Sequence, residues 1–195
     1  TYNHPNPAGD IFARDTYFGL SDNPVQIQGS FVSYLLLHEI GHALGLSHPY
    51  DVGAHPSTDH LNSTMSYNDL SSSAPPALSG KGYAASPMLD DIRAIQHIYG
   101  ANTSHNTGDN TYLLNNDGAL RTIWDMGGTD IFDASGNDAS ANIDLRAGNH
   151  SVQGVVSQTA IADGTVIENA IGSIFNDVIT GNDADNILEG RAGND

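Results

Sequence analysis

The sequence has no cysteine among its 195 residues, and only 6 lysine and arginine residues stand against 23 aspartate and glutamate residues. The absence of cysteine excludes disulfide bonds and thiol chemistry. The net charge of −17 argues against nucleic acid and anionic membranes as partners, because proteins that bind them carry basic surfaces. No apolar run approaches the roughly 18 residues that a membrane-spanning helix needs. We therefore expect no nucleic-acid partner and no membrane span, and acidic side chains that collect cations.

The stretch that begins at His38 reads HEIGHALGLSH and fits the zinc-protease pattern H-E-x-x-H-x-x-G-x-x-H. His38 and His42 are four residues apart, so on a helix they share one face and can hold one ion. Gly45 follows where a helix end often needs a positive φ, and His48 can then return as the third ligand. Three protein ligands leave one zinc position open for a water molecule, whose proton Glu39 can accept. A buried helix with merely packed histidines is the alternative, but it does not explain this register.

Local signals predict two helices. The first is expected to begin after Ser30, a good N-cap, and to run to Leu44. The second is expected to be capped by Ser86, with Pro87 in its first turn, and to end at Gly100.

The composition changes after residue 100. Residues 101–195 hold 12 of the 21 glycines, and their net charge is −11 against −6 for residues 1–100. Short β-prone segments recur at 111–114, 120–124, 143–145, 152–156 and 166–167. We therefore predict two units: residues 1–100 as part of a zinc metalloprotease domain, and residues 101–195 as an all-β domain.

The end of the sequence contains a repeat that starts at about residue 172. Glycines and acidic or amide residues recur there at a spacing of nine: Gly172, Gly181 and Gly190, and Asp177, Asn186 and Asp195. The pattern approximates G-G-x-G-x-D-x-U-x, the calcium-binding nonapeptide of RTX proteins. Calcium takes six to eight oxygen ligands, so carbonyl groups of two stacked turns would have to contribute. A plain loop rich in Asn and Asp is the alternative.

Together these motifs resemble the serralysins, which are secreted zinc metalloproteases of the metzincin clan with an RTX β-roll. Pro49 directly after the third histidine adds to the resemblance, as does the STMSY stretch of residues 63–67, which looks like the family's Met-turn. The resemblance implies an α+β fold, with a metzincin lower subdomain that contains the zinc-binding helix, followed by an all-β calcium-binding parallel β-roll. It also implies a secreted, extracellular zinc endopeptidase that hydrolyses peptide bonds in proteins.

The resemblance assigns roles to individual residues. It implies four zinc ligands: His38, His42, His48 and Tyr67. Of these, Tyr67 would be a switchable ligand that releases to hydrogen-bond the transition-state oxyanion. Glu39 would be the general base, and Met65 would form the apolar floor under the histidines.

The resemblance also implies calcium ligands in three loops and in the repeats. In the loops they are Asn106, Gly108 and Asn110, then Asp125, Gly127, Gly128 and Asp130, and finally Val166 and Glu168. In the repeats they are the second, fourth and sixth positions: Ser173, Phe175 and Asp177, then Asn182, Ala184 and Asn186, then Arg191, Gly193 and Asp195. The first two positions of each repeat would coordinate through backbone carbonyls.

The implied cofactors are Zn²⁺ and Ca²⁺, and the implied partners are protein or peptide substrates. Because only about 37 residues precede His38, we expect a portion of a longer protease that lacks the N-terminal half of its protease domain and its C-terminal end. The missing N-terminal half would then be a further partner. The alternative function is a calcium-binding RTX structural or binding module whose zinc site is inactive in this truncated chain, because the substrate-binding half is missing. The intact Glu39 favours an enzyme. Membership of another metzincin family is disfavoured by Pro49 and the nonapeptides.

Overall fold

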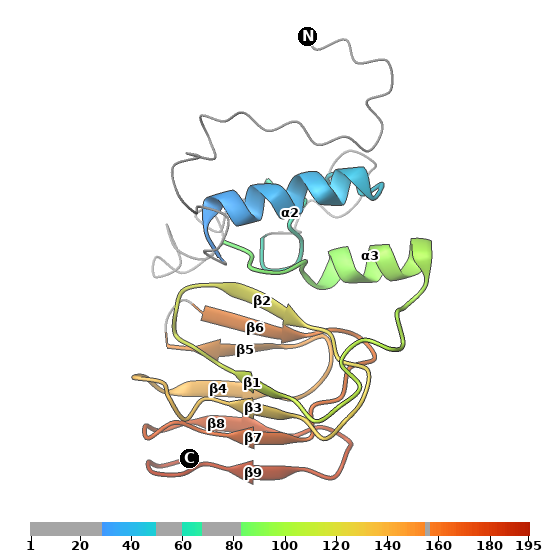
Figure 1. The fold of residues 1–195 in the computed structure, drawn as a ribbon. Helices are drawn as coiled ribbons and strands as arrows, with labels where there is room; N and C mark the ends of the chain where they lie inside the picture. The colour runs from blue at the N-terminus through green and yellow to red at the C-terminus, as the bar shows by residue number, and fades with distance from the viewer. Residues whose placement is uncertain (1–28, 50–59, 68–82, 155–156) are drawn as a thin grey trace, which may run out of the picture.

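The computed structural model describes residues 29–49, 60–67, 83–154 and 157–195 (Figure 1). Two helices lie together at one end of the described part, and the strands are stacked below them (Figure 1). The elements are α2 (Phe31–Ala43), α3 (Leu89–Tyr99), β1 (Thr111–Leu113), β2 (Leu120–Ile123), β3 (Ile131–Asp133), β4 (Ala141–Asp144), β5 (His150–Gln153), β6 (Ser157–Ile161), β7 (Asn169–Ile171), β8 (Val178–Thr180) and β9 (Ile187–Glu189). This mostly β architecture with two helices is consistent with the predicted α+β class. Within the described residues, no helix is both long and apolar enough to span a membrane.

Helix α2 has the ends that the sequence predicts. The Ser30 side chain accepts a hydrogen bond from the Ser33 backbone N–H at 3.2 Å, which satisfies a free donor of the first turn. At the other end Gly45 adopts φ +93°, and the Leu46 N–H donates back to the Gly41 carbonyl at 2.9 Å. This left-handed glycine cap turns the chain back along the helix.

Helix α3 begins later than predicted. Its first residue is Leu89 and its N-cap is Met88, so the prediction of Ser86 as the cap is wrong. The Ser86 hydroxyl instead accepts a hydrogen bond from the Thr122 N–H of β2 at 2.8 Å. This tertiary contact keeps Ser86 away from the helix end. Gly100, with φ +84°, ends the helix as predicted.

The strands form two sheets, ordered β1-β3-β7-β9 and β2-β6-β5-β4-β8. All neighbours in the first sheet are parallel, with Tyr112, Phe132, Ala170 and Leu188 in one register. In the second sheet β2–β6 and β4–β8 are parallel, whereas β5 runs antiparallel to β4 and β6. Side chains from both sheets share one apolar core, which includes Phe132, Ile143 and Ile161.

The predicted strand segments were partly right. Segments 111–114, 120–124 and 143–145 overlap β1, β2 and β4, and segment 152–156 overlaps the end of β5, although residues 155–156 lie outside the described residues. Segment 166–167 is wrong, because it lies in the turn before β7. Ile167 is nevertheless fully buried in the core, and this inward-facing turn residue produced the false strand signal.

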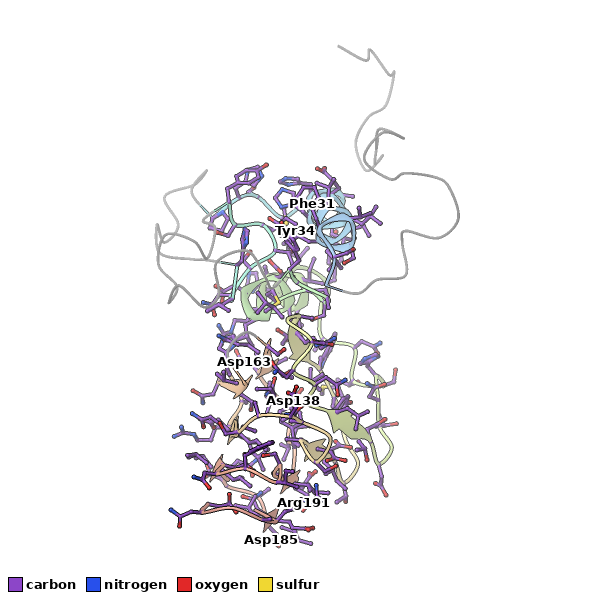
Figure 2. The ribbon with its side chains drawn as sticks, turned by 90° about the vertical axis from the view of Figure 1, so that its left-hand side faces the viewer. Phe31, Tyr34, Asp138, Asp163, Asp185 and Arg191 are labelled. Carbon is purple, nitrogen blue, oxygen red and sulfur yellow. The ribbon has the colours of Figure 1, made fainter. Side chains whose placement is uncertain are left out.

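The helical end is packed directly on the strands. Tyr34 of α2, Ala84, Met88 and Leu120 of β2 form a second apolar cluster. Ala84 also forms an isolated parallel bridge with Leu120. Figure 2 shows Phe31 and Tyr34 at this end of the molecule, with Arg191 and Asp185 at the opposite end. The predicted boundary at residue 100 remains a prediction.

Candidate metal centres

Three histidines converge at the C-terminal end of α2. His42 Nε2 lies 3.1 Å from His48 Nε2, which lies 3.2 Å from His38 Nε2. In a tetrahedral zinc site with Zn–N bonds of about 2.0–2.1 Å, two ligand nitrogens are about 3.3 Å apart. The helix provides two of the rings, and the turn at Gly45 returns the third. The geometry therefore fits one zinc ion. The three histidines form a group of potential metal ligands whose ligand atoms all lie within 4.8 Å of one another.

Backbone carbonyls orient two of these rings. His38 Nδ1 lies 2.8 Å from the Thr64 carbonyl oxygen, and His42 Nδ1 lies 2.9 Å from the Leu46 carbonyl oxygen. A carbonyl oxygen only accepts, so Nδ1 carries the proton in each neutral ring and the Nε2 lone pair faces the centre of the group. Burial lowers the pKa of His38, which favours this neutral, metal-binding form.

The predicted base and the predicted oxyanion donor both lie beside this group. A cavity of about 320 Å³ is lined by the half-buried Glu39, the buried His38 and aromatic side chains that include Tyr67. The Tyr67 ring lies 4.4 Å from the His48 ring and 5.3 Å from the His38 ring, measured between centroids. Its side chain is 63% exposed, so it stands at the open side of the site.

Gly41 is a contributor that the sequence reasoning missed. A Cβ atom on Gly41 would overlap the sulfur of Met65, whose side chain is only 1% exposed. Met65 thus packs directly against the backbone of the helix turn between the first two histidines. Glycine inside a helix is about 1 kcal/mol less favourable than alanine, and that penalty was the available sequence signal.

Asp91 of α3 was also missed as a supporting residue. Its carboxylate is 3% exposed and accepts four hydrogen bonds, from the Ser63 hydroxyl at 2.7 Å, the Thr64 N–H and hydroxyl at 2.8 Å each, and the Met88 N–H at 2.9 Å. The carbonyl of the same Thr64 orients His38. Asp91 therefore fixes the loop that positions a candidate zinc ligand.

A second cluster is carboxylate-rich and lies at the turn before β3. Asp125 and Asp130 are both essentially inaccessible to solvent. Asp130 Oδ1 accepts a hydrogen bond from the Asn110 N–H at 2.8 Å, but Oδ2 has no hydrogen-bond partner among the described residues. Burial raises the pKa of Asp130 to about 6, and the negative charges of Asp125 and Glu168 add to this. Crowded buried carboxylates with an unpaired oxygen fit a bound cation.

The predicted calcium loops meet around this cluster. The Glu168 carboxylate accepts a hydrogen bond from the Asp130 N–H at 2.7 Å. Gly128, with φ +131°, lies so close to the Gly108 carbonyl that a Cβ would overlap it. The same turns contain Asn106 and Gly127, which both have a positive φ, and Val166, which is 47% exposed. The structure thus brings together the three loops that the sequence separated by about 60 residues.

The three repeats do not share one edge of the strand stack. The turns of the first and third repeats are stacked, because the Asp177 N–H donates to Asp195 at 2.8 Å and Gly193 lies against the Phe175 carbonyl. Ser173 and Arg191 lie in these same two turns, and Arg191 has φ +73°. The turn of the second repeat, with Asn182, Ala184 and Asn186, instead contacts residues 145 and 167–168.

Helix α2 thus leads into a three-histidine group with an adjacent glutamate, and stacked, mostly parallel strands follow it in the chain. The profile of the family described as "Peptidase M10 serralysin C terminal" matches residues 89–194, which is more than half of the chain. The chain therefore belongs to the serralysin family, as the sequence motifs predicted.

Three relatives illustrate the similarity. The chain is 40% identical to a serralysin of Proteus mirabilis, and the alignment covers 93% of this chain and 41% of the relative. It is 39% identical to the metallopeptidase AprA of Pseudomonas marginalis, covering 79% of this chain and 38% of the relative. It is 43% identical to serralysin C of Dickeya chrysanthemi, covering 74% and 35%. The chain thus spans about two fifths of the length of these relatives.

Proposed function

We propose that the protein acts as a secreted zinc endopeptidase that hydrolyses peptide bonds in proteins. The observation that carries this proposal is the convergence of three histidine Nε2 atoms beside the half-buried Glu39. The Nε2 atom of His48 lies 3.1 Å from that of His42 and 3.2 Å from that of His38. The relatives named as serralysins and metallopeptidases support the same reaction class.

The residues of the site have separable roles in this proposal. His38, His42 and His48 would hold the zinc ion, which when bound polarises the scissile carbonyl and lowers the pKa of a coordinated water towards about 7. Glu39 accepts the proton of the attacking water and passes it to the leaving amine. Tyr67 donates a hydrogen bond to the oxyanion of the tetrahedral intermediate. The cavity beside Glu39 gives the substrate room next to these groups.

Hydrolysis of casein by the complete protease, with and without a zinc chelator, tests the proposal. We expect hydrolysis that the chelator abolishes and added zinc restores, at a calcium concentration held constant throughout. Casein left intact by the complete protease in every condition would contradict the proposal. The alternative of a binding module with an inactive zinc site predicts no hydrolysis by residues 1–195 alone, although calcium would still bind.

We further propose that the β region binds calcium, supported by the unpaired and buried Asp130 Oδ2 and by the crowding of Asp125, Asp130 and Glu168. Calcium would neutralise these carboxylates and complete its six to eight oxygen ligands with backbone carbonyls. The proposed ligands are Asn106, Gly108, Asn110, Asp125, Gly127, Gly128, Asp130, Val166 and Glu168, and, in the stacked first and third repeats, Ser173, Phe175, Asp177, Arg191, Gly193 and Asp195.

Replacing Tyr67 with phenylalanine is expected to lower kcat by roughly 10²–10³-fold and to change KM little. A hydroxyl that acts on the oxyanion works in the transition state rather than in substrate binding. Zinc content should stay unchanged, because three histidines remain. Steady-state kinetics on a peptide substrate, together with metal analysis, check this. An unchanged kcat would remove Tyr67 from the mechanism.

Asp130→Asn is expected to have opposite effects on stability with and without calcium. The pKa of Asp130 is about 6 in the folded chain against an ordinary value of 3.8, so between about pH 4 and about pH 6 the folded state binds more protons than the unfolded state. Without calcium, stability therefore falls as pH rises through this window, and the neutral asparagine should raise the Tm at pH 7. With calcium, the variant loses a ligand and should melt below the wild type.

Thermal unfolding at pH 5 and pH 7, in chelator and in millimolar calcium, measures both effects. One occupied site contributes about 2.7 kcal/mol at a hundredfold excess of calcium over Kd. Asp138→Asn serves as the control, because Asp138 is exposed and belongs to neither cluster (Figure 2). A calcium-dependent stability that is identical in wild type and Asp130→Asn would contradict the assignment.

A further inference from the structure

The second repeat differs from its neighbours in the groups at the centre of its turn. Asn186 occupies the position that aspartate holds in the first and third repeats, and Asn182 lies four residues before it. Each of these side chains carries an amide, which has two donor hydrogens and one acceptor oxygen. The calcium pattern predicted from the sequence needs oxygen ligands at this point.

All four amide hydrogens point at oxygen atoms of the protein. Asn182 Nδ2 lies 3.0 Å from the Leu145 carbonyl oxygen and 2.8 Å from the Ile167 carbonyl oxygen. Asn186 Nδ2 lies 2.9 Å from the Glu168 carbonyl oxygen and 2.9 Å from Asn182 Oδ1. Three backbone carbonyls, one at residue 145 and two at residues 167 and 168, therefore converge on two amide groups.

Backbone groups determine which end of each amide is the nitrogen. Asn186 Oδ1 accepts a hydrogen bond from the Asn182 N–H at 2.9 Å, and Asn182 Oδ1 accepts one from the Ala184 N–H at 3.0 Å. A backbone N–H can only donate and a carbonyl can only accept. Turning either amide over would set oxygen against oxygen and N–H against N–H, so the orientation is forced.

We propose that the turn of residues 181–186 binds no calcium, and that the Asn182 and Asn186 amides replace the ion as the bridge between stacked turns. This inference rests on the proposed calcium function of the other turns. A calcium ion needs oxygen ligands at about 2.3–2.6 Å. In this turn the carbonyl oxygens instead face the Nδ2 atoms of Asn182 and Asn186. An NH₂ group repels a cation, and no amide hydrogen or oxygen here is left without a partner.

Among the described residues, no carboxylate hydrogen-bonds to the amide groups of Asn182 and Asn186. The Glu168 side chain accepts a hydrogen bond from the Asp130 N–H at 2.7 Å, so it is turned towards the carboxylate-rich cluster of Asp125 and Asp130. Asp183 and Asp185 belong to the same turn, but both are exposed, and Figure 2 shows Asp185 at the outer end of the strand stack. The Asp144 carboxylate, which precedes Leu145 in the chain, is paired with the exposed Arg146 at 2.6 Å.

The first repeat shows the contrasting arrangement at the equivalent positions. Asp177 is 2% exposed, and its carboxylate accepts hydrogen bonds from the Ser173 N–H, the Ser173 hydroxyl and the Ala141 N–H. The Asp177 backbone N–H donates to the Asp195 carboxylate at 2.8 Å, which places these two aspartates in adjacent stacked turns. The two edges of the strand stack thus use different chemistry, carboxylate on one and amide on the other.

Asn186→Ala in the complete protein tests the inference, with bound calcium counted by equilibrium dialysis and the Tm measured in chelator and in millimolar calcium. We expect the wild-type number of ions and an equal fall in Tm in both conditions, because the lost bonds do not involve calcium. Asp177→Ala is the matched control, and it should lose an ion and fall further in calcium than in chelator. An ion lost from Asn186→Ala, or a fall confined to the calcium condition, would overturn the inference.

Asn186→Asp gives a second, isosteric test. The new carboxylate would face the Glu168 carbonyl and Asn182 Oδ1, so we expect a lower Tm in chelator that calcium raises again, with one more ion bound than in wild type. A Tm in chelator equal to that of wild type would contradict the amide bridge.

Failure of the inference can be told apart from failure of the proposed calcium function. A wild-type protein that binds no calcium would refute the calcium function, while a calcium-independent fall in Asn186→Ala would still support the amide bridge. An Asn186→Ala variant as stable as wild type would refute the bridge, even in a protein that binds calcium elsewhere.

Discussion

Replacing Glu39 with glutamine is expected to lower the kcat for peptide hydrolysis by roughly 10²–10⁴-fold, the usual contribution of a general base. Glutamine keeps the size and shape of the side chain, but its neutral amide cannot accept the proton of the attacking water. The Nε2 atoms of the three histidines do not depend on this residue, so zinc content should remain at one ion per chain. Steady-state kinetics and metal analysis of the same preparation measure the two properties separately.

Two companion variants make the result specific. His42→Ala removes a ligand whose Nε2 lies 3.1 Å from that of His48, and should lose both zinc and activity. Glu189→Gln changes an exposed glutamate in β9 and should behave as wild type. Full activity in Glu39→Gln would refute the assigned base, and zinc loss in that variant would show a structural role instead.

The second large effect is expected from Asp91→Ala, which should lower the free energy of unfolding by roughly 3 kcal/mol or more. The substitution leaves four buried donors, on Ser63, Thr64 and Met88, without their acceptor, and each unsatisfied buried group costs about 1–3 kcal/mol, although such terms do not add fully. Because the Thr64 carbonyl orients His38, zinc affinity should also fall, by about 10–100-fold as for other outer-shell changes.

Asp90→Ala is the matched control for this prediction. Asp90 is the neighbouring residue, but it pairs with Arg93 at 2.9 Å in an exposed ion pair, which contributes at most about 1 kcal/mol. Denaturant unfolding and a zinc competition titration compare the two variants. Equal and small effects of Asp91→Ala and Asp90→Ala would contradict the role of the buried carboxylate.

Local sequence signals predicted the features that depend on nearby residues. The Ser30 cap, the left-handed Gly45 and the return of His48 all lie within one helix and its end. Their interactions span only a few positions, so residue type and spacing were sufficient. The same holds for the nine-residue period of the repeats, which sets the rhythm of turn and strand.

Elsewhere, long-range contacts made predictions from the local sequence wrong or incomplete. Ser86 has the composition of a helix cap, yet the Thr122 N–H, 36 residues away, binds its hydroxyl. Ile167 has the character of a strand residue but fills the core from a turn. The supports of the zinc candidate, Asp91 and the contact of Gly41 with Met65, also join distant segments. No spacing rule covers such pairs, because the backbone must first fold to bring them together.

By itself, the sequence determined the three-histidine motif with its glutamate, the repeat period and the excess of acidic residues, because each is a matter of residue type and spacing. The tertiary structure alone decided which turns stack on which. It placed the turns of Asp177 and Asp195 together and set Asn182 and Asn186 against the carbonyls of residues 145, 167 and 168. The same nonapeptide pattern therefore places carboxylates between the stacked turns of Asp177 and Asp195, and amides between the turn of Asn186 and its neighbours. Only the fold could decide this pairing, because the partners of each turn come from distant parts of the chain.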